Sequence, residues 1–175
     1  MKVLTFAASS SSTSINKQLA FYAASLLHDV DIETLDINDY EMPLFSEDKE
    51  RELGQPEQAK RFFEKIGQAD AIIISFAEHN GSYTAAYKNL FDWTSRINQK
   101  LFQNKPMVLL ATSPGPGGAS NVLAAAKGSA PFFAGEVKAA LSIPSFYDNF
   151  DPKQKVLTST DLLKQLTQAV TQLKS

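Results

Sequence analysis

The sequence contains no cysteine and only two histidines among its 175 residues. The absence of cysteine excludes disulfide bonds, thiolate metal sites, iron–sulfur ligation and a catalytic thiol. The two histidines, His28 and His79, lie far apart in the chain, without the spacing of a metal-ligand pair. A zinc site is therefore not predicted.

The chain also lacks a strong charge of one sign and any long hydrophobic run. Seventeen basic and nineteen acidic residues give a formal net charge of −2, whereas nucleic-acid-binding domains are usually basic. No run approaches the roughly 18 apolar residues that a membrane helix needs, and the first residues do not read as a signal peptide. We therefore expect a cytoplasmic protein that binds neither nucleic acid nor a membrane.

Several catalytic motifs are missing. No Gly-x-Ser-x-Gly occurs, which disfavours a serine hydrolase, and no Gly-Lys-Ser/Thr of a phosphate-binding P-loop is present. The first apolar run is followed by serines rather than by the acidic cluster of a receiver domain. Paired carboxylates occur in surface-like stretches, at 47–48 and 50–52, and are interpreted as solvated.

Short apolar runs alternate with amphipathic stretches along the whole chain. The expected strands are residues 3–8, 31–37, 71–76, 107–111 and 137–143. The expected helices are residues 14–27, 56–67, 83–98, 119–127 and 160–173. Such alternation predicts a parallel sheet with helices on both faces. We expect one domain over residues 1–175, a three-layer α/β sandwich of the flavodoxin-like type with strand order 2-1-3-4-5.

Two stretches have no clear assignment. Residues 38–55 lack clean periodicity and are interpreted either as a cover over a neighbouring subunit or as a loose surface loop. Residues 144–156 are expected to form a loop. In the predicted topology, ligands bind outside the carboxyl ends of the strands where the strand order reverses. The loops there are residues 9–16, 78–83 and 112–118, each of unusual composition.

The first of these loops reads Ser-Ser-Ser-Ser-Thr-Ser-Ile-Asn over residues 9–16. It leads into a helix, whose first N–H groups and partial positive charge favour a phosphate. Its hydroxyls add neutral donors, and it contains no lysine or arginine. The alternative is a turn in which Ser12, Thr13 or Ser14 caps the helix.

The other two loops are rich in turn residues. Asn80-Gly81 favours a tight turn, and Gly81 permits a positive φ and close approach of a planar ligand. The alternative is a simple turn with Ser82 as the next helix cap. Residues 112–118 hold three glycines and two prolines, which suits exposed backbone N–H groups beside a flat ligand. A crowded turn without function is the alternative there.

Taken together, the loops resemble the NAD(P)H-dependent FMN reductase family, a flavodoxin-like family that includes quinone, chromate and azo-dye reductases. The family's Gly-Ser-x-Arg-x-x-Ser-x-Asn corresponds to residues 8–16, with Ser11 in place of arginine. Its Pro-Glu-Tyr-Asn-Gly-Ser corresponds to residues 77–82, with His79 in place of tyrosine. The Ser-x-Gly-Gly that follows a strand opened by Lys-Pro corresponds to residues 105–118. The resemblance covers residues 1 to about 143.

This resemblance implies FMN as cofactor, NAD(P)H as co-substrate, and ping-pong hydride transfer to a small acceptor such as a flavin or quinone. It implies that the FMN phosphate is held by Ser9, Ser11, Ser14, Ile15 and Asn16. It implies that the isoalloxazine ring is lined by Glu78, His79, Asn80 and Gly81, and at its far edge by Ser113, Gly115, Gly117 and Gly118. No catalytic acid or base and no metal is implied, because the cofactor carries the chemistry.

Two other functions are compatible with the sequence. A flavodoxin-like electron carrier that docks on protein partners, or a flavin-free binding module, would share the fold, since fold does not fix function. The resemblance also implies a homodimer or homotetramer. Tyr87, Phe91 and Trp93 are interpreted either as part of such an interface or as helix core.

Overall fold

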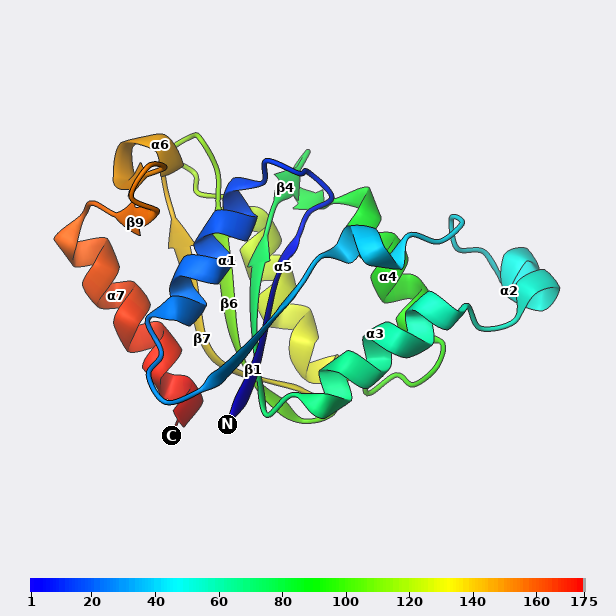
Figure 1. Ribbon diagram of the computed structural model, residues 1–175. Coiled ribbons are helices and arrows are strands. Elements are labelled where there is room, and N and C mark those ends of the chain that lie inside the picture. The colour runs from blue at the N-terminus through cyan, green and yellow to red at the C-terminus, as the bar shows by residue number, and fades with distance from the viewer. Residues whose placement is uncertain (175) are drawn as a thin grey trace.

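Five parallel strands form the central sheet of the computed structural model, which describes residues 1–174 (Figure 1). The strands are β1 Lys2–Ala8, β2 Asp31–Leu35, β3 Ala71–Phe76, β6 Lys105–Thr112 and β7 Gly135–Ile143. Their order is β2-β1-β3-β6-β7, and each neighbouring pair is parallel. The predicted order 2-1-3-4-5 is confirmed; the labels differ because two short strands, β4 and β5, intervene.

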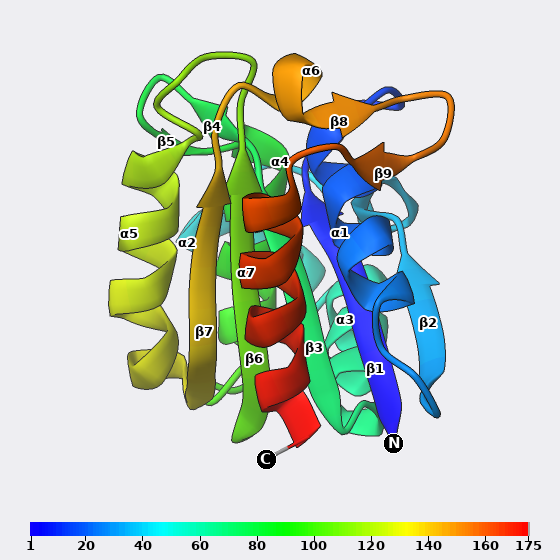
Figure 2. The ribbon, with the colours of Figure 1, turned by 90° about the vertical axis from the view of Figure 1, so that its left-hand side faces the viewer.

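Helices cover both faces of this sheet. Helices α1 Ile15–Ser25 and α7 Thr160–Thr171 lie on one face, in front of the sheet in Figure 2. Helices α3 Glu57–Gln68, α4 Ala85–Ser95 and α5 Ser120–Ser129 belong to the opposite face. These are the five predicted helices, with ends that differ from the prediction by a few residues. The three-layer flavodoxin-like architecture is therefore confirmed.

Alternate residues of the strands face two different hydrophobic cores, one on each side of the sheet. Ile73 and Val108 face the core under α1 and α7, whereas Ile72 and Leu109 face the core under α3, α4 and α5. This alternation follows from the two-residue period of a strand. Every residue of β3 is buried, as expected for an inner strand of a sheet covered on both sides.

The segment between β2 and α3 contains structure that the sequence pattern did not predict. The expected strand 31–37 ends at Leu35, and a 3₁₀ helix, η1 Ile37–Tyr40, follows it. Helix α2 Glu47–Leu53 begins after the cap residue Ser46 and buries none of its residues. Without a buried face, α2 leaves no apolar periodicity in the sequence. The paired carboxylates at 47–48 lie on this exposed helix, as expected.

Helix α4 ties the start of this segment to the body of the protein. Asn89 donates from Nδ2 to the carbonyl oxygens of Met42 and Pro43, each at 3.1 Å. Trp93 donates from Nε1 to the carbonyl oxygen of Pro43 at 2.7 Å, and its ring meets that of Phe45 edge-on at 5.1 Å. These contacts show that residues 42–45 are anchored rather than loose.

The three aromatic residues of α4 differ in their burial. Tyr87 and Trp93 are 3% and 0% exposed in the single chain, so both belong to the core. Phe91 is partly buried and meets the ring of Phe133 edge-on at 4.6 Å. The interpretation of this stretch as helix core is therefore correct for Tyr87 and Trp93.

The segment after β7 is not the loop that was expected. It contains α6 Phe146–Asn149 and a small antiparallel pair, β8 Phe150–Asp151 and β9 Val156–Leu157. A 3₁₀ turn, η2 Ala130–Phe133, precedes β7, and another, η3 Gln172–Lys174, follows α7. Within residues 1–174, no helix has the length and apolar character needed to cross a membrane.

Candidate functional site

The loops after β1, β3 and β6 meet at the carboxyl edge of the sheet, at the top of Figure 2, and line a depression of about 300 Å³. Its wall includes the predicted site residues Ser9, Ser11, Ser14, Ile15, Asn16, Glu78, His79 and Ser113. Asn80, Gly81, Gly115, Gly117 and Gly118 belong to the same loops but not to this wall. The prediction that three distant loops form one site at the strand-order reversal is consistent with this geometry.

The serine loop, residues 9–14, ends in a capped helix. Among the three candidate cap residues it is Ser14 that caps α1, because its Oγ accepts the backbone N–H of Lys17 at 3.2 Å. Ser9 Oγ accepts the backbone N–H of Ser11 at 3.3 Å. The N–H groups of Ile15 and Asn16 lie in the first helical turn, where no intrahelical acceptor exists. This end of α1 therefore presents neutral donors and a partial positive charge to the depression.

Asn16 joins the first loop to the ends of two strands. Its buried Oδ1 accepts the backbone N–H of Thr112 at 3.0 Å and the hydroxyl of Ser75 at 2.7 Å. Its Nδ2 donates to the carbonyl oxygen of Thr112 at 3.1 Å. The side chain thus fixes the relative position of the loops after β1 and β6, a role that sequence reasoning did not identify.

The second loop is a hairpin whose first residue caps a distant helix. Strands β4 Glu78–His79 and β5 Ser82–Tyr83 are joined by Asn80 and Gly81, whose φ angles of 52° and 78° suit a type I′ turn. The Glu78 carboxylate accepts the backbone N–H of Val122 at 2.8 Å, in the first turn of α5. Thr84, rather than Ser82, caps α4.

Removing this carboxylate is expected to destabilise α5. The residue before α5, Ala119, provides no side-chain cap. Glu78 therefore caps the helix, although it lies 44 residues away from Val122 in sequence. Glu78→Ala should lower the free energy of unfolding by about 1 kcal/mol, as the loss of a helix cap does. Urea unfolding measures this loss. Asn121→Ala is the matched control, because it removes the weaker 3.4 Å contact to Glu78 and leaves the Val122 bond. An equal loss in both variants would contradict the capping role.

The third loop combines one tightly packed glycine with two open ones. Gly118 has a φ of +58°, and a Cβ there would lie 2.2 Å from Ser142 Oγ and 3.2 Å from the backbone of Pro144. Around Gly115 and Gly117, a Cβ would meet nothing within 4 Å. The predicted glycines therefore divide into one that permits close packing of the loop on the chain after β7 and two that lie at an open edge.

Helix α6 brings a side chain to the site that sequence reasoning missed. The backbone N–H of Phe146 donates to the carbonyl oxygen of Ser113 at 3.0 Å, and that of Ser145 donates to Gly115 at 2.9 Å. These bonds place Tyr147, 66% exposed, in the wall of the depression. The available signal was the Phe-Tyr pair just beyond the carboxyl end of the fifth predicted strand.

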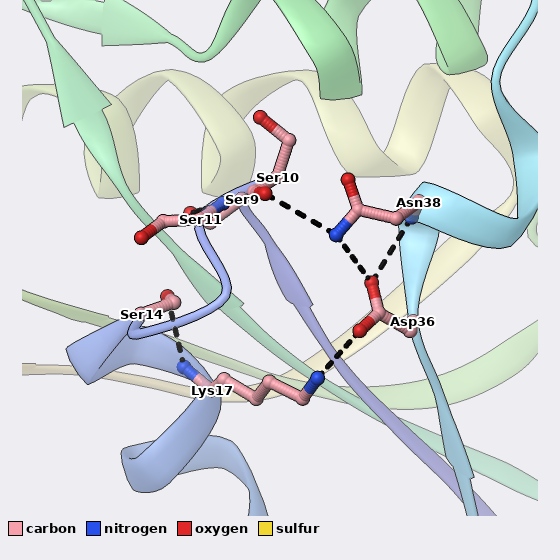
Figure 3. A network of polar contacts seen from close by, with 7 residues as sticks. All are labelled: Ser9, Ser10, Ser11, Ser14, Lys17, Asp36 and Asn38. Atoms are coloured by element: carbon pink, nitrogen blue, oxygen red, sulfur yellow. Dashed lines mark hydrogen bonds and ion pairs between the residues drawn. The ribbon is translucent and has the colours of Figure 1, made fainter.

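A polar network joins the serine loop to the end of β2 (Figure 3). The ammonium group of Lys17 pairs with the Asp36 carboxylate. Asp36 Oδ1 accepts the backbone N–H and the Nδ2 of Asn38, at 3.0 and 2.9 Å. Asn38 Nδ2 also donates to the carbonyl oxygen of Ser10 at 3.2 Å. Lys17 thus places a positive charge beside a loop that has none of its own.

This network makes the stability depend on pH. Burial pushes the pKa of Asp36 upward, but the hydrogen bonds from Lys17 and Asn38 outweigh it and hold that pKa below its ordinary value. The ionised carboxylate therefore stabilises the folded state above the unfolded pKa of about 3.9. This stabilisation disappears as the pH falls through the lowered folded-state pKa.

Asp36→Asn is expected to reduce the free energy of unfolding at pH 7 by at most about 1 kcal/mol, because the pair is one third exposed. The difference from the unchanged protein should shrink toward zero between about pH 5 and pH 2. Urea unfolding across this range measures it. Glu64→Gln, at an exposed position on α3, is the control. A difference that grows as the pH falls would contradict the assignment.

No cluster of three or more histidine and acidic side chains able to hold a metal occurs in the described part of the chain. The wall of the depression offers hydroxyls, backbone N–H groups and a helix N-terminus, besides the side chains of Glu78 and His79. Such a donor set suits a phosphate, and the open glycines leave room beside it for a flat ring.

Residues 1–148 match the model of a family described as NADPH-dependent FMN reductase. The chain is 35% identical over 117 residues to a 2-hydroxy-1,4-benzoquinone reductase from a Burkholderia species. It is 36% identical over 116 residues to an NAD(P)H-dependent FMN reductase from Pseudomonas aeruginosa. Each match covers 66% of this chain, but the matches span only 62% and 61% of the two relatives.

Solved structures share the fold at lower sequence identity. FerB, a flavoenzyme NAD(P)H:(acceptor) oxidoreductase from Paracoccus denitrificans, superposes with a TM-score of 0.77 at 24% identity, covering 98% of this chain and 94% of that one. An FMN-dependent NADH-azoreductase from Bacillus anthracis, solved in complex with FMN, gives a TM-score of 0.67 at 12% identity, covering 99% of each chain.

Proposed function

Because this chain belongs to the NADPH-dependent FMN reductase family, we propose that it is an FMN-dependent NAD(P)H oxidoreductase acting on a small acceptor such as a quinone or a flavin. The observation that carries the proposal is the convergence of three loops on one polar depression. That depression lies where flavodoxin-like sheets bind their ligands.

The chemistry of the serine loop supports a phosphate at this position. The first turn of α1 offers backbone N–H groups, and the hydroxyls of Ser11 and Thr13 are exposed. The carboxylate in the wall, Glu78, is hydrogen-bonded to the N-terminus of α5. This hydrogen bond disperses a negative charge that would otherwise repel a phosphate. The donors are neutral, so the phosphate charge would be held by dipoles, while the nearby Lys17 is paired with Asp36.

The hairpin and the glycine loop support a flat ring beside that phosphate. Asn80 and Gly81 are exposed at the tip of the hairpin, and Gly115 and Gly117 have open space on their Cβ side. When bound, FMN would supply a centre that takes hydride from the nicotinamide and passes electrons to the acceptor in a ping-pong sequence. The chain itself would hold and orient the ring and offer backbone N–H groups to developing negative charge.

The direct test measures NADPH and NADH oxidation by the FMN-loaded protein, with 1,4-benzoquinone as acceptor. We expect turnover well above that of free FMN and parallel-line kinetics when both substrates are varied. A protein that retains FMN but oxidises neither coenzyme would point to the electron carrier. A protein that cannot retain FMN would point to the flavin-free module. Either result would overturn the proposal.

The homodimer or homotetramer stays a prediction. A groove of about 310 Å³ between α4 and α5 supports an interface there, since Tyr83, Phe91 and Phe133 line it. Light scattering during gel filtration should give two or four times the mass of one chain. A mass of one chain would contradict the prediction.

A further inference from the structure

A second groove borders the serine loop on the outer side of α1 and has a volume of about 420 Å³. It shares Thr13 and Ser14 with the depression at the strand ends. Lys17, Phe21 and Ser25 follow Ser14 along its lining at spacings of three, four and four, so the groove follows one face of the helix. The groove is therefore a continuation of the proposed phosphate site, and the proposed function does not use it.

The groove combines positive charge with aromatic surface. The ammonium group of Lys17 lies 5.9 Å from the ring centroid of Phe21, and Tyr22 adds a second, partly buried ring. Lys155 reaches the groove from the turn between β8 and β9. Lys17 is paired with Asp36, whereas the exposed Lys155 has no ion pair within residues 1–174. An uncompensated positive charge is thus left at the rim.

We propose that this groove binds the phosphorylated adenosine end of the nicotinamide coenzyme, an inference that rests on the proposed function. Lysine ammonium groups bind phosphate as point charges, and an aromatic wall offers a stacking surface to a purine. The volume lies within the usual range for small-molecule sites, about 300–1,000 Å³. Because the groove adjoins the serine loop, one coenzyme would place its nicotinamide over the depression and its adenosine along α1.

The same chemistry is found in the adenosine monophosphate half of FAD, and the experiment separates the two sources. Isothermal titration of the 175-residue chain uses adenosine 2′,5′-bisphosphate, which carries the two phosphates attached to the adenosine of NADPH and lacks the nicotinamide nucleotide. We expect saturable binding that weakens about fivefold in Lys155→Ala, because one exposed charge contributes up to about 1 kcal/mol. Lys153→Ala is the matched control, because Lys153 lies exposed in the same turn but does not line the groove. It should bind as the unchanged protein does.

Steady-state kinetics provide the second readout. In Lys155→Ala, the KM for NADPH should rise about fivefold, with a smaller rise for NADH, which has one phosphate fewer. Tighter binding of FAD than of FMN, abolished by Lys155→Ala, would overturn the assignment to the nicotinamide coenzyme, because the groove would then hold the adenosine phosphate of the cofactor. Two other results would overturn this inference and leave the proposed function standing. One is coenzyme oxidation without any binding of the bisphosphate, and the other is an equal loss of bisphosphate affinity in both lysine variants. Absence of coenzyme oxidation would instead count against the proposed function.

Discussion

Asn16→Ala is expected to lower the free energy of unfolding by about 3–5 kcal/mol. The substitution would leave the Ser75 hydroxyl and the N–H and C=O of Thr112 buried without their partner. Each such orphaned group costs about 1–3 kcal/mol, and neighbouring losses are not fully additive. Urea unfolding followed by circular dichroism measures the change. Asn16→Ala should also release the serine loop from the end of β6 and weaken FMN binding.

The matched control is Asn98→Ala, because Asn98 is exposed and accepts one local bond, from the backbone N–H of Lys100. That variant should stay within about 1 kcal/mol of the unchanged protein. If Asn16→Ala cost no more than this control, the link between the two loops would not be a principal contact of the site.

Gly118→Ala is expected to lower the free energy of unfolding by about 2–5 kcal/mol. The positive φ of +58° alone disfavours a Cβ by about 1–2 kcal/mol. The added carbon would also crowd Ser142 Oγ and the Pro144 backbone. Ser142 could rotate away only by giving up its 2.7 Å bond to the Gly118 carbonyl oxygen. Overpacking of this kind typically costs a further 1–3 kcal/mol, by the usual rough estimate.

Gly115→Ala separates packing from ligand binding in the same loop. Because a Cβ at Gly115 would meet nothing within 4 Å, its unfolding free energy should change by less than about 0.5 kcal/mol. Its FMN affinity should nevertheless fall, because the proposed ring edge occupies that space. Thermal unfolding and FMN titration of both variants measure the two effects. Equal stability of the two variants, or unchanged FMN affinity in Gly115→Ala, would contradict this division of roles.

The sheet and the place of the site were predictable from sequence because both follow from local patterns. The apolar runs at residues 71–76 and 107–111 mark inner strands, and a parallel sheet gathers the following loops at one edge. The turn at Asn80-Gly81 could likewise be predicted without knowledge of tertiary contacts. Few residue types adopt the positive φ angles that this turn requires, and Asn and Gly are among them.

What could not be predicted depends on contacts between distant residues. Asn16 resembles an ordinary first-turn residue until Thr112, 96 positions away, is placed beside it. Glu78 gives no sign in sequence that it caps α5. Helix α2 has no buried face, and Tyr147 reaches the site only because α6 packs on the third loop. Propensity and periodicity carry none of this information.

We propose that the serine loop and the N-terminus of α1 hold the FMN phosphate with neutral donors. The most direct measurement compares the dissociation constants of FMN and riboflavin for the apoprotein, by quenching of flavin fluorescence. Hydrogen bonds to a charged group are worth about 1.5–3 kcal/mol each. FMN should therefore bind at least about 100-fold more tightly than riboflavin. Equal dissociation constants for the two flavins would contradict the claim.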